Sequence, residues 1–350
     1  MAEKGQIRIA LAGNPNCGKT TMFNNITGAK QHVGNYAGVT VEKKEGHTKF
    51  DGHELLFIDL PGTYSLTARS LDELVARNVI VNDNPDVIVN VLDASNLERN
   101  LYLAAQLLEL EKPMVIALNM ADVAEEMGIK YDFKKMAELT GATIVSTVGR
   151  TNIGTKELLE ATISVADSQK APGVTVNYGD LLEGKIAELV AALEEAGTVT
   201  YPLRWIAIKL LENDPDVVEK VKGFANTEAV LQKAAAIREE IKDQVDLDIV
   251  FQEYRHRYAV EVYNQSLTQA PKEIETRSDR YDKILTHRIW GLPIFMIVMY
   301  LLFAFVNIVG GIPQGWIEDG FAALQAYADQ NIPEGQLQSL VSDGIIAGVG

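Results

Sequence analysis

Short apolar runs alternate with helix-like stretches in the first half of the chain. Continuous apolar runs such as Val87–Asp93 are typical of parallel strands covered on both faces. Strands are predicted at Ile7–Ala12, Val39–Phe50, Glu54–Asp59, Val87–Asp93, Met114–Asn119 and Thr143–Ser146. Helices are predicted at Thr20–Thr27, Leu71–Asn82, Asn96–Leu110, Asp132–Thr140 and Gly154–Ala166. This alternation predicts an α/β domain with a doubly wound, mostly parallel sheet over residues 1–168.

The pattern changes after residue 168. Residues 168–180 contain Pro172, Gly173 and Gly179 without any period, as a linker does. From Leu181 to about Leu267 apolar residues recur at helical spacing in about five stretches. An all-α helical bundle is therefore predicted for residues 169–270. The expected N-caps of its helices are Asp180, Asp214 and Asn226.

A third pattern begins at Ile289. Residues 289–309 are almost entirely apolar, and 21 residues are enough to cross a bilayer as a helix. A buried core helix of a soluble protein is the alternative. Beyond it, the stretch from Pro313 has an amphipathic pattern, and residues 310–350 are expected to form a non-cytoplasmic segment and the start of a further membrane region.

The charges around this apolar run predict its orientation. The segment 271–288 is a basic juxtamembrane linker, whereas residues 310–350 contain no Lys or Arg. Because positively charged flanks stay on the cytoplasmic side, residues 1–288 are predicted to be cytoplasmic. The basic residues of the linker are Lys272, Arg277, Arg280, Lys283 and Arg288.

Composition narrows the possible partners. The net charge of −16 argues against nucleic acid as a partner, because no basic stripe is available to neutralise phosphates. Cys17 is the only cysteine, so a disulfide framework is excluded and a reducing compartment is expected. The histidines, His32, His47, His53, His256 and His287, show no metal-ligand spacing, and His47 and His53 flank a predicted hairpin and are expected at the surface.

The stretch Gly13–Thr20 reads GNPNCGKT and lies between a predicted strand and a predicted helix. Its spacing matches the loop that binds the phosphates of nucleoside triphosphates. Glycines let backbone N–H groups approach the phosphates, Lys19 supplies a charge to the β- and γ-phosphates, and Thr20 offers a hydroxyl to Mg²⁺. Cys17 is interpreted as a spacer and not as a nucleophile. A Gly-rich turn followed by Lys is the alternative.

Four further segments are predicted to complete a guanine-nucleotide site. Asp59 to Gly62 reads DLPG, which places a carboxylate beside Mg²⁺ and an amide near the γ-phosphate. Thr40 is the candidate that closes on Mg²⁺ and the γ-phosphate, although it also suits the start of a strand. Asn119 to Asp122 reads NMAD, and the Asp122 carboxylate can accept bonds from guanine N1 and the 2-amino group, a donor pair that adenine lacks. Main-chain amides of Ser146, Thr147 and Val148 are expected to support the base.

The motifs GNPNCGKT, NYAGVTVE, DLPGTYSL and NMAD together resemble the ferrous iron transport protein B (FeoB) family. The resemblance implies a Ras-like P-loop GTPase domain, a helical domain similar to a nucleotide-dissociation inhibitor, and a membrane domain. Family members continue through more spans, so the chain looks truncated. The resemblance also implies a K⁺ held by Asn16, with a turn residue as the alternative. No glutamine follows Gly62, where Thr63, Tyr64 and Ser65 stand, so slow turnover is expected with the water held by backbone and the Val39–Thr40 loop.

The catalytic candidates are Lys19, Thr40 and Gly62, and the metal candidates are Thr20, Thr40 and Asp59 for Mg²⁺ and Asn16 for K⁺. The residues predicted to line the nucleotide site are Gly13, Asn14, Pro15, Asn16, Cys17, Gly18, Lys19, Thr20, Thr21, Gly38, Val39, Thr40, Val41, Glu42, Asp59, Leu60, Pro61, Gly62, Asn119, Met120, Ala121, Asp122, Ser146, Thr147 and Val148.

The sequence thus predicts a GTP-hydrolysing cytoplasmic part that drives or gates Fe²⁺ uptake through a multi-pass protein of the cell inner membrane. Its expected partners are GTP and GDP, Fe²⁺, the lipid bilayer, a second copy of the chain and small accessory iron-transport proteins, the last two implied by the resemblance alone. The loops at Thr40 and Gly62 are expected to signal through the helical domain and residues 279–288. Two alternatives stay open: a membrane-tethered regulatory GTPase, and a nucleotide-binding module that never hydrolyses.

Overall fold

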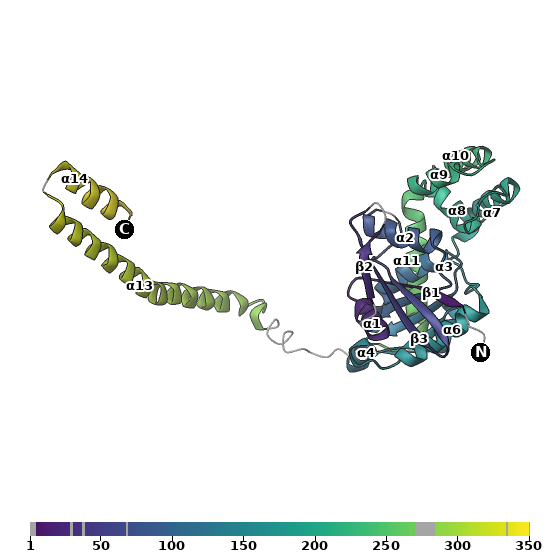
Figure 1. Cartoon of the computed structure of the whole chain (residues 1–350), viewed down its shortest axis with the longest axis horizontal. Coiled ribbons are helices and arrows are strands. Elements are labelled where there is room, and N and C mark those ends of the chain that lie inside the picture. The colour runs from purple at the N-terminus through teal and green to yellow at the C-terminus, as the bar shows by residue number, and fades with distance from the viewer. Residues whose placement is uncertain are drawn as a thin grey trace. The chain divides into compact units, whose positions relative to one another are not determined.

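The computed structural model describes residues 5–28, 31–36, 39–67, 69–270, 284–333 and 335–349. The chain divides into two compact units, Met1–Lys272 and Glu273–Gly350, which are described separately (Figure 1). Some predictions lie outside the described residues. These are the contact from Gly38 and most of the basic linker, including Lys272, Arg277, Arg280 and Lys283.

A seven-stranded sheet forms the centre of the first unit. Its strands are β1 (Gln6–Gly13), β2 (Gln31–Asn35), β3 (Glu42–Phe50), β4 (His53–Asp59), β5 (Val87–Asp93), β6 (Met114–Asn119) and β8 (Thr143–Ser146). They lie in the order β2-β3-β4-β1-β5-β6-β8. The strands from β4 to β8 run parallel, whereas β2 and β3 are antiparallel at one edge. The predicted fold class is confirmed.

Helices cover both faces of this sheet (Figure 1). They are α1 (Lys19–Thr27), α2 (Leu71–Asn82), α3 (Leu97–Leu108), α4 (Ala121–Glu126), α5 (Phe133–Thr140) and α6 (Thr155–Ser168), with the 3₁₀ turns η1 (Ala94–Asn96) and η2 (Gly149–Thr151). Because strand side chains alternate between faces, two cores form. One contains Val89 with Phe23 of α1, and the other contains Ile88 with Leu101 of α3.

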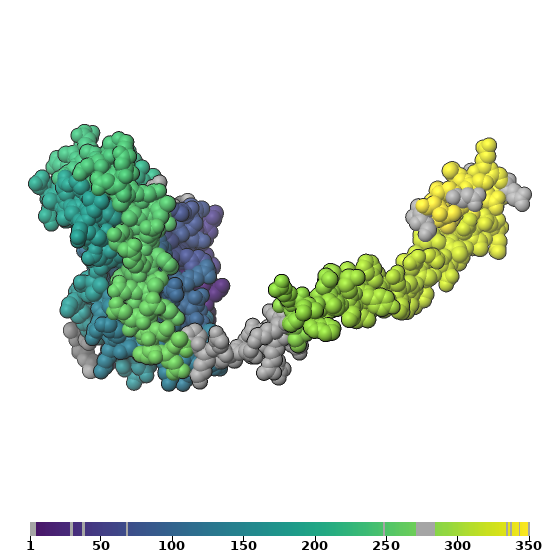
Figure 2. All heavy atoms as spheres, turned by 180° about the vertical axis from the view of Figure 1, so that it is seen from behind, coloured from purple at the N-terminus to yellow at the C-terminus, as the bar shows by residue number. Residues whose placement is uncertain are grey.

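The all-α region predicted after residue 168 is also present. Its helices are α7 (Gly179–Ala196), α8 (Leu203–Leu211), α9 (Pro215–Lys222), α10 (Glu228–Ile241) and α11 (Leu247–Ser266). Ile206 of α8 and Phe251 of α11 belong to the same buried cluster as Leu101, so the helical region shares a core with the sheet domain. Figure 2 shows α11 in green along the surface of this unit, where it packs against α3 and α5.

A small ladder joins the end of the helical region back to the sheet domain. β7 (Lys130–Tyr131) pairs antiparallel with β9 (Leu267–Gln269). The Asp132 amide donates to the Ser266 carbonyl at 2.7 Å, and the Thr268 hydroxyl donates to the Lys130 carbonyl at 2.9 Å. Strand β9, which follows the helical region, therefore pairs with the segment that comes directly after α4 in sequence.

The second unit is dominated by one long helix, α13 (Gly291–Asn331). By length and composition it could cross a membrane, with a mean hydropathy of 2.5 in its most apolar window. At ~1.5 Å per residue its 41 residues extend about 60 Å, twice the hydrocarbon core of a bilayer. Pro313 and the amphipathic stretch after it lie inside this continuous helix, so the apolar run predicted at residues 289–309 does not end as a helix of its own. Short helical pieces follow: α14 (Gln336–Ser339), the π-helix η3 (Leu340–Ile346) and α15 (Ala347–Val349).

Local differences from the prediction have physical causes. The predicted strand Val39–Phe50 begins only at Glu42, so Thr40 lies in a loop. Asp214 caps α9 through bonds from the amides of Asp216 and Val217, as predicted. Asp180 is no cap, because α7 already begins at Gly179. His47 is exposed, whereas His53 is buried as the first residue of β4 and the surface prediction for it is wrong.

The N-cap prediction at Asn226 is also wrong. Thr227 is the residue that precedes α10, and no side-chain cap bond forms. Its hydroxyl donates instead to the carbonyls of Val221 and Phe224, at 2.7 and 3.0 Å. The polar side chain at this corner therefore closes the preceding helix, α9, and leaves α10 uncapped.

Candidate functional site

The predicted phosphate loop connects β1 to α1 without strain at its glycines. Gly18 has φ of +87°, which L side chains rarely adopt, and a Cβ there would lie 2.2 Å from Nδ2 of Asn119. A Cβ on Gly13 would lie 2.6 Å from the Val91 carbonyl. Both positions need glycine because the Asn119 side chain and the Val91 carbonyl lie too close to leave room for a Cβ.

Lys19, the first residue of α1, forms an ion pair with Asp59 at the end of β4. Both side chains are buried, at 8% and 7% exposure. Burial raises the pKa of the Asp59 carboxyl, and the ammonium of Lys19 opposes that effect. The structure thus brings the two charged groups of the phosphate loop and the DLPG motif together.

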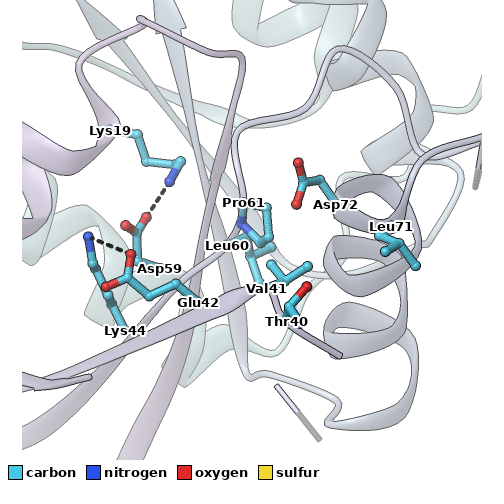
Figure 3. Close-up of a pocket in the computed structure, with 10 residues that line it drawn as sticks. All are labelled: Lys19, Thr40, Val41, Glu42, Lys44, Asp59, Leu60, Pro61, Leu71 and Asp72. Atoms are coloured by element: carbon cyan, nitrogen blue, oxygen red, sulfur yellow. Dashed lines mark hydrogen bonds and ion pairs between the residues drawn. The ribbon is translucent and has the colours of Figure 1, made fainter. Parts of the chain in front are cut away.

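A pocket of about 510 Å³ opens around this pair (Figure 3). Predicted residues at its wall are Lys19, Thr40, Val41, Glu42, Asp59, Leu60 and Pro61. Lys44 and the first residues of α2, Leu71 and Asp72, also line it and were missed by sequence reasoning. Only Lys44 had a sequence signal, because β-strand alternation places it on the face of Glu42, with which it pairs at 3.4 Å.

Tyr36 anchors the loop that carries Thr40. Its hydroxyl donates to the Asp59 carbonyl at 3.3 Å, and its amide donates to the Val41 carbonyl at 2.9 Å. The Val39 amide in turn donates to the Tyr36 carbonyl at 3.2 Å. The side chain is buried, and burial raises the pKa of its phenol. Tyr36 was part of the NYAGVTVE motif, but no pattern in the sequence indicated this anchoring contact.

The DLPG loop lies directly against the phosphate loop. The Leu60 amide donates to the Leu11 carbonyl at 3.1 Å, and the Thr63 amide donates to the Gly13 carbonyl at 3.3 Å. A Cβ on Gly62 would approach Pro15 Cα to 3.3 Å. The two loops that would contact phosphates are therefore held side by side.

The other predicted loop residues differ in exposure. Asn16, Thr20 and Thr21 are exposed, whereas Asn14 is buried and donates from Nδ2 to the Arg99 carbonyl at 3.5 Å. The Asn14 side-chain nitrogen is thus bound to the main chain of α3. Burial raises the pKa of the Cys17 thiol to about 11, which supports its interpretation as a spacer.

Asn119 connects the phosphate loop to the predicted base loop. Its Nδ2 donates to the Cys17 carbonyl at 2.8 Å. Its Oδ1 accepts from the Gly149 amide at 2.8 Å and from the Thr147 hydroxyl at 3.3 Å. One buried amide therefore fixes two loops that are more than a hundred residues apart in sequence.

Asp122 lies in the first turn of α4, for which Met120 is the N-cap and Ala121 the first residue. Its carboxylate pairs with Arg150 at 3.2 Å. The Thr147 amide donates to the Leu118 carbonyl and the Val148 amide to the Ile153 carbonyl, at 2.9 and 3.0 Å. Base contacts from Ser146, Thr147 and Val148 stay a prediction, and these two amides already have protein acceptors.

The donors around the 510 Å³ pocket fit Mg²⁺ better than a soft metal. Asp59 and Thr40 line the pocket with a carboxylate and a hydroxyl, and Thr20 is the exposed residue that follows Lys19; such oxygen ligands are those that Mg²⁺ prefers. Among the described residues, no cluster of three or more His, Cys, Asp or Glu side chains could hold a metal. The exposed side-chain oxygen of Asn16 is accessible to a monovalent ion beside the phosphate loop.

Two family models match consecutive parts of the chain. Ferrous iron transport protein B matches residues 7–162, and the FeoB cytosolic helical domain matches residues 178–268. A Fe(2+) transport protein A/Fe(2+) transporter FeoB fusion protein from Porphyromonas gingivalis is 38% identical over 98% of this chain. The Fe(2+) transporter FeoB of Staphylococcus aureus is 37% identical over 97% of it. The chain spans 42% and 52% of these two relatives.

Solved structures agree with these matches. The cytosolic domain of T. maritima FeoB in a GDP form is 32% identical, with a TM-score of 0.65 over 75% of this chain and 98% of that one. A GDP-bound variant of S. thermophilus NFeoB is 34% identical, with a TM-score of 0.69 over 75% and 100% of the two chains. Both share the P-loop GTPase fold described above. With its sheet, phosphate loop and helical region all matched, the chain belongs to the ferrous iron transport protein B (FeoB) family.

Proposed function

We propose that residues 1–272 bind GTP, hydrolyse it to GDP and phosphate, and gate Fe²⁺ uptake through the membrane part of a longer transporter. The observation that carries this proposal is the buried pair of Lys19 and Asp59 in a 510 Å³ pocket shared with Thr40. Phosphoryl transfer to water needs little covalent chemistry from a protein, so positioned charges and amides are what such a site must supply.

The predicted site residues have separate tasks in this reaction. Lys19 exchanges Asp59 for the β- and γ-phosphates, and the Gly62 amide donates to the γ-phosphate. Thr20, Thr40 and Asp59 are the residues that would hold Mg²⁺, which neutralises charge on the phosphate oxygens. The attacking water is oriented by backbone of the Val39–Thr40 loop, because Thr63, Tyr64 and Ser65 offer no equivalent of a glutamine.

Guanine is selected at the other end of the site. The Asp122 carboxylate accepts from N1–H and the 2-amino group, whereas adenine would leave it unpaired at a cost of ~1–3 kcal/mol. Asn119 binds both the Gly149 loop and the phosphate loop, and this supports a guanine site between them whose two sides stay at a constant distance. Gly38, Ser146, Thr147 and Val148 complete the proposed nucleotide contacts.

Asn16 is proposed to hold a K⁺ that accelerates turnover. Its side chain is exposed in the phosphate loop with φ of +66°, where its oxygen can meet an ion beside the phosphates. A bound K⁺ would supply positive charge where charge develops in the transition state. Turnover is therefore expected to be slow in Na⁺ and faster in K⁺.

Gating is supported by α2. Its first residues, Leu71 and Asp72, line the pocket, and Arg77 in its middle is fully buried against the helical region. The Arg77 guanidinium pairs with Asp214 at 2.5 Å and with Asp216 at 2.6 Å, at the start of α9. A shift of α2 on hydrolysis would have to move or break this buried contact. The helical region is thus positioned to respond to the nucleotide.

The test is phosphate release from residues 1–272, a compact unit with its own cores, in K⁺ and in Na⁺. Wild type is compared with Asn16→Ala and with Lys19→Ala as the inactive control. Faster release in K⁺ that is lost in Asn16→Ala supports GTP hydrolysis and the K⁺ site. Equal rates in both salts above the Lys19→Ala baseline refute only the K⁺ site. Release no faster than that baseline refutes hydrolysis.

The transport part needs the longer protein. Arg77→Met in a full-length transporter that carries this chain is expected to reduce uptake of radioactive Fe²⁺ while GTP hydrolysis continues. Lys222→Met removes an exposed charge of the same helical region, which pairs with Glu219 of α9 at 3.1 Å, and is the matched control. Unchanged Fe²⁺ uptake in the Arg77→Met protein would refute gating through α2.

A further inference from the structure

We propose that Arg150 competes with guanine for the Asp122 carboxylate and thereby speeds nucleotide release. The inference rests on the proposed guanine-nucleotide binding and adds a residue that controls its lifetime. It starts from one contact: Nη2 of Arg150 lies 3.2 Å from Oδ2 of Asp122. The same carboxylate is the group that must accept the two donors of guanine.

The side chains of Asp122 and Arg150 differ in their exposure to solvent. The side chain of Asp122 is 28% exposed and belongs to the first turn of α4, whereas that of Arg150 is 81% exposed. A long, exposed guanidinium can leave the carboxylate for water at little cost, because exposed ion pairs contribute only slightly to stability. Arg150 is therefore a competitor that yields to the base and returns when the base leaves.

The loop that carries Arg150 is held in place from two sides. The Gly149 amide donates to Oδ1 of Asn119 at 2.8 Å, and its carbonyl accepts from Nδ2 of Asn25 at 2.6 Å. A Cβ on Gly154, at the other end of the loop, would lie 2.1 Å from the Ser146 carbonyl. Because its backbone is fixed next to Asn119, Arg150 projects from a constant position beside Asp122.

The Asp122 carboxylate cannot bind both guanine and Arg150 with ideal geometry at the same time. Guanine N1–H and the 2-amino group form a parallel pair of bonds that requires both carboxylate oxygens in the plane of the base. Arg150 already binds one of these oxygens. Exposed ion pairs of this kind change equilibria by about two- to five-fold. If the ion pair forms as the base leaves, it lowers the barrier and speeds release by up to that factor.

The experiment measures release of fluorescent mant-GDP from the 350-residue chain in detergent micelles, chased with unlabelled GDP. Arg150→Ala is expected to slow release about two- to five-fold in 0.1 M salt. The difference should narrow in 1 M salt, because the screening length falls from ~10 to ~3 Å. Lys156→Ala removes an equally exposed charge, which pairs with Glu160 at 3.6 Å on α6, and should release at the wild-type rate.

The Asp122→Asn variant distinguishes competition for the carboxylate from an effect of Arg150 on the conformation of its loop. In Asp122→Asn, the amide donates to the 2-oxo group of xanthine, so mant-XDP replaces mant-GDP. With no carboxylate to compete for, adding Arg150→Ala to this variant should leave release unchanged. Equal slowing in both backgrounds would show that Arg150 acts through the loop and would overturn the inference.

The outcomes also distinguish this inference from the function on which it rests. Binding of mant-GDP with identical or faster release from Arg150→Ala would refute the competition and leave the guanine-nucleotide function intact. If neither protein binds mant-GDP while both unfold cooperatively, the guanine-nucleotide function is refuted, and the competition with it.

Discussion

Replacing Arg255 by Met would test how strongly the helical region is joined to the GTPase domain. The guanidinium is fully buried on α11 and binds Glu109 through Nε at 2.7 Å and Nη2 at 3.0 Å. Its Nη1 binds Glu212 at 2.6 Å. Tyr178 donates its hydroxyl to Glu109 as well. The cluster therefore contains the C-terminus of α3, the end of α8 and the middle of α11.

The magnitude follows from these contacts. Three charge-assisted hydrogen bonds at ~1.5–3 kcal/mol each give a gross loss of about 5–9 kcal/mol. Removing a buried cation also recovers part of its desolvation cost, and breaking one side of a buried ion pair costs ~3–5 kcal/mol in total. Glu109, 2% exposed, would be left with the Tyr178 hydroxyl. We expect the free energy of unfolding to fall by about 3–5 kcal/mol.

Urea unfolding of residues 1–272 at pH 7 measures this loss through the fluorescence of Trp205, which is buried and is the only tryptophan before residue 273. Lys233→Met breaks a half-exposed pair with Glu188 and should cost less than ~1 kcal/mol. Glu109→Gln removes the stranded charge, so adding it to Arg255→Met should restore at least about 1 kcal/mol. A loss below ~1 kcal/mol in Arg255→Met would refute the buried-cluster argument.

Three further predictions follow from the same structure. Gly18→Ala should weaken mant-GDP binding at least about ten-fold and lower the free energy of unfolding by ~1–3 kcal/mol, whereas Gly28→Ala, with positive φ but no atom within 4 Å of its Cβ, should retain binding. Burial raises the pKa of Glu212, but Lys209 and Arg255 outweigh it and lower that pKa from 4.5 to about 2. About 3 kcal/mol of stability should therefore be present above pH 4.5 and be lost toward pH 2. Urea titrations at several pH values measure this loss, and a free energy of unfolding that does not change with pH would contradict it. Alkylation of Cys17 by iodoacetamide at pH 8 should be more than about 100-fold slower in the folded unit than in urea, because burial raises its pKa to about 11; equal rates would contradict this.

Contiguous signals made much of this fold predictable. The bounds of α2, Leu71–Asn82, match the prediction, because Ser70 accepts from the Glu73 amide and thus marks the helix start. Buried strands such as β5 were apparent from unbroken apolar runs. The phosphate loop was predicted because its glycines, Lys19 and Thr20 lie within eight residues, so the complete motif can be found in one short stretch of sequence.

What could not be predicted depends on distant contacts. β2 has a polar sequence, QHVGN, and exists because its backbone pairs with β3 at the sheet edge. β7 and β9 have two and three residues and lack any local pattern. Leu71 and Asp72 reach the 510 Å³ pocket only through the placement of α2. Likewise, no spacing rule connects Asp122 to Arg150.

The pairing of β7 with β9 has a mechanical consequence. The first unit ends just past β9, so any tension on the segment that follows is carried first by this ladder and by the bonds of Asp132 and Thr268. β7 begins four residues after α4, the helix that carries Asp122. A pull from the following segment would therefore load α4 and the end of the sheet domain where guanine is proposed to bind before it strained the helical bundle. Force on the chain would thus reach the helix of Asp122, the proposed guanine contact, first.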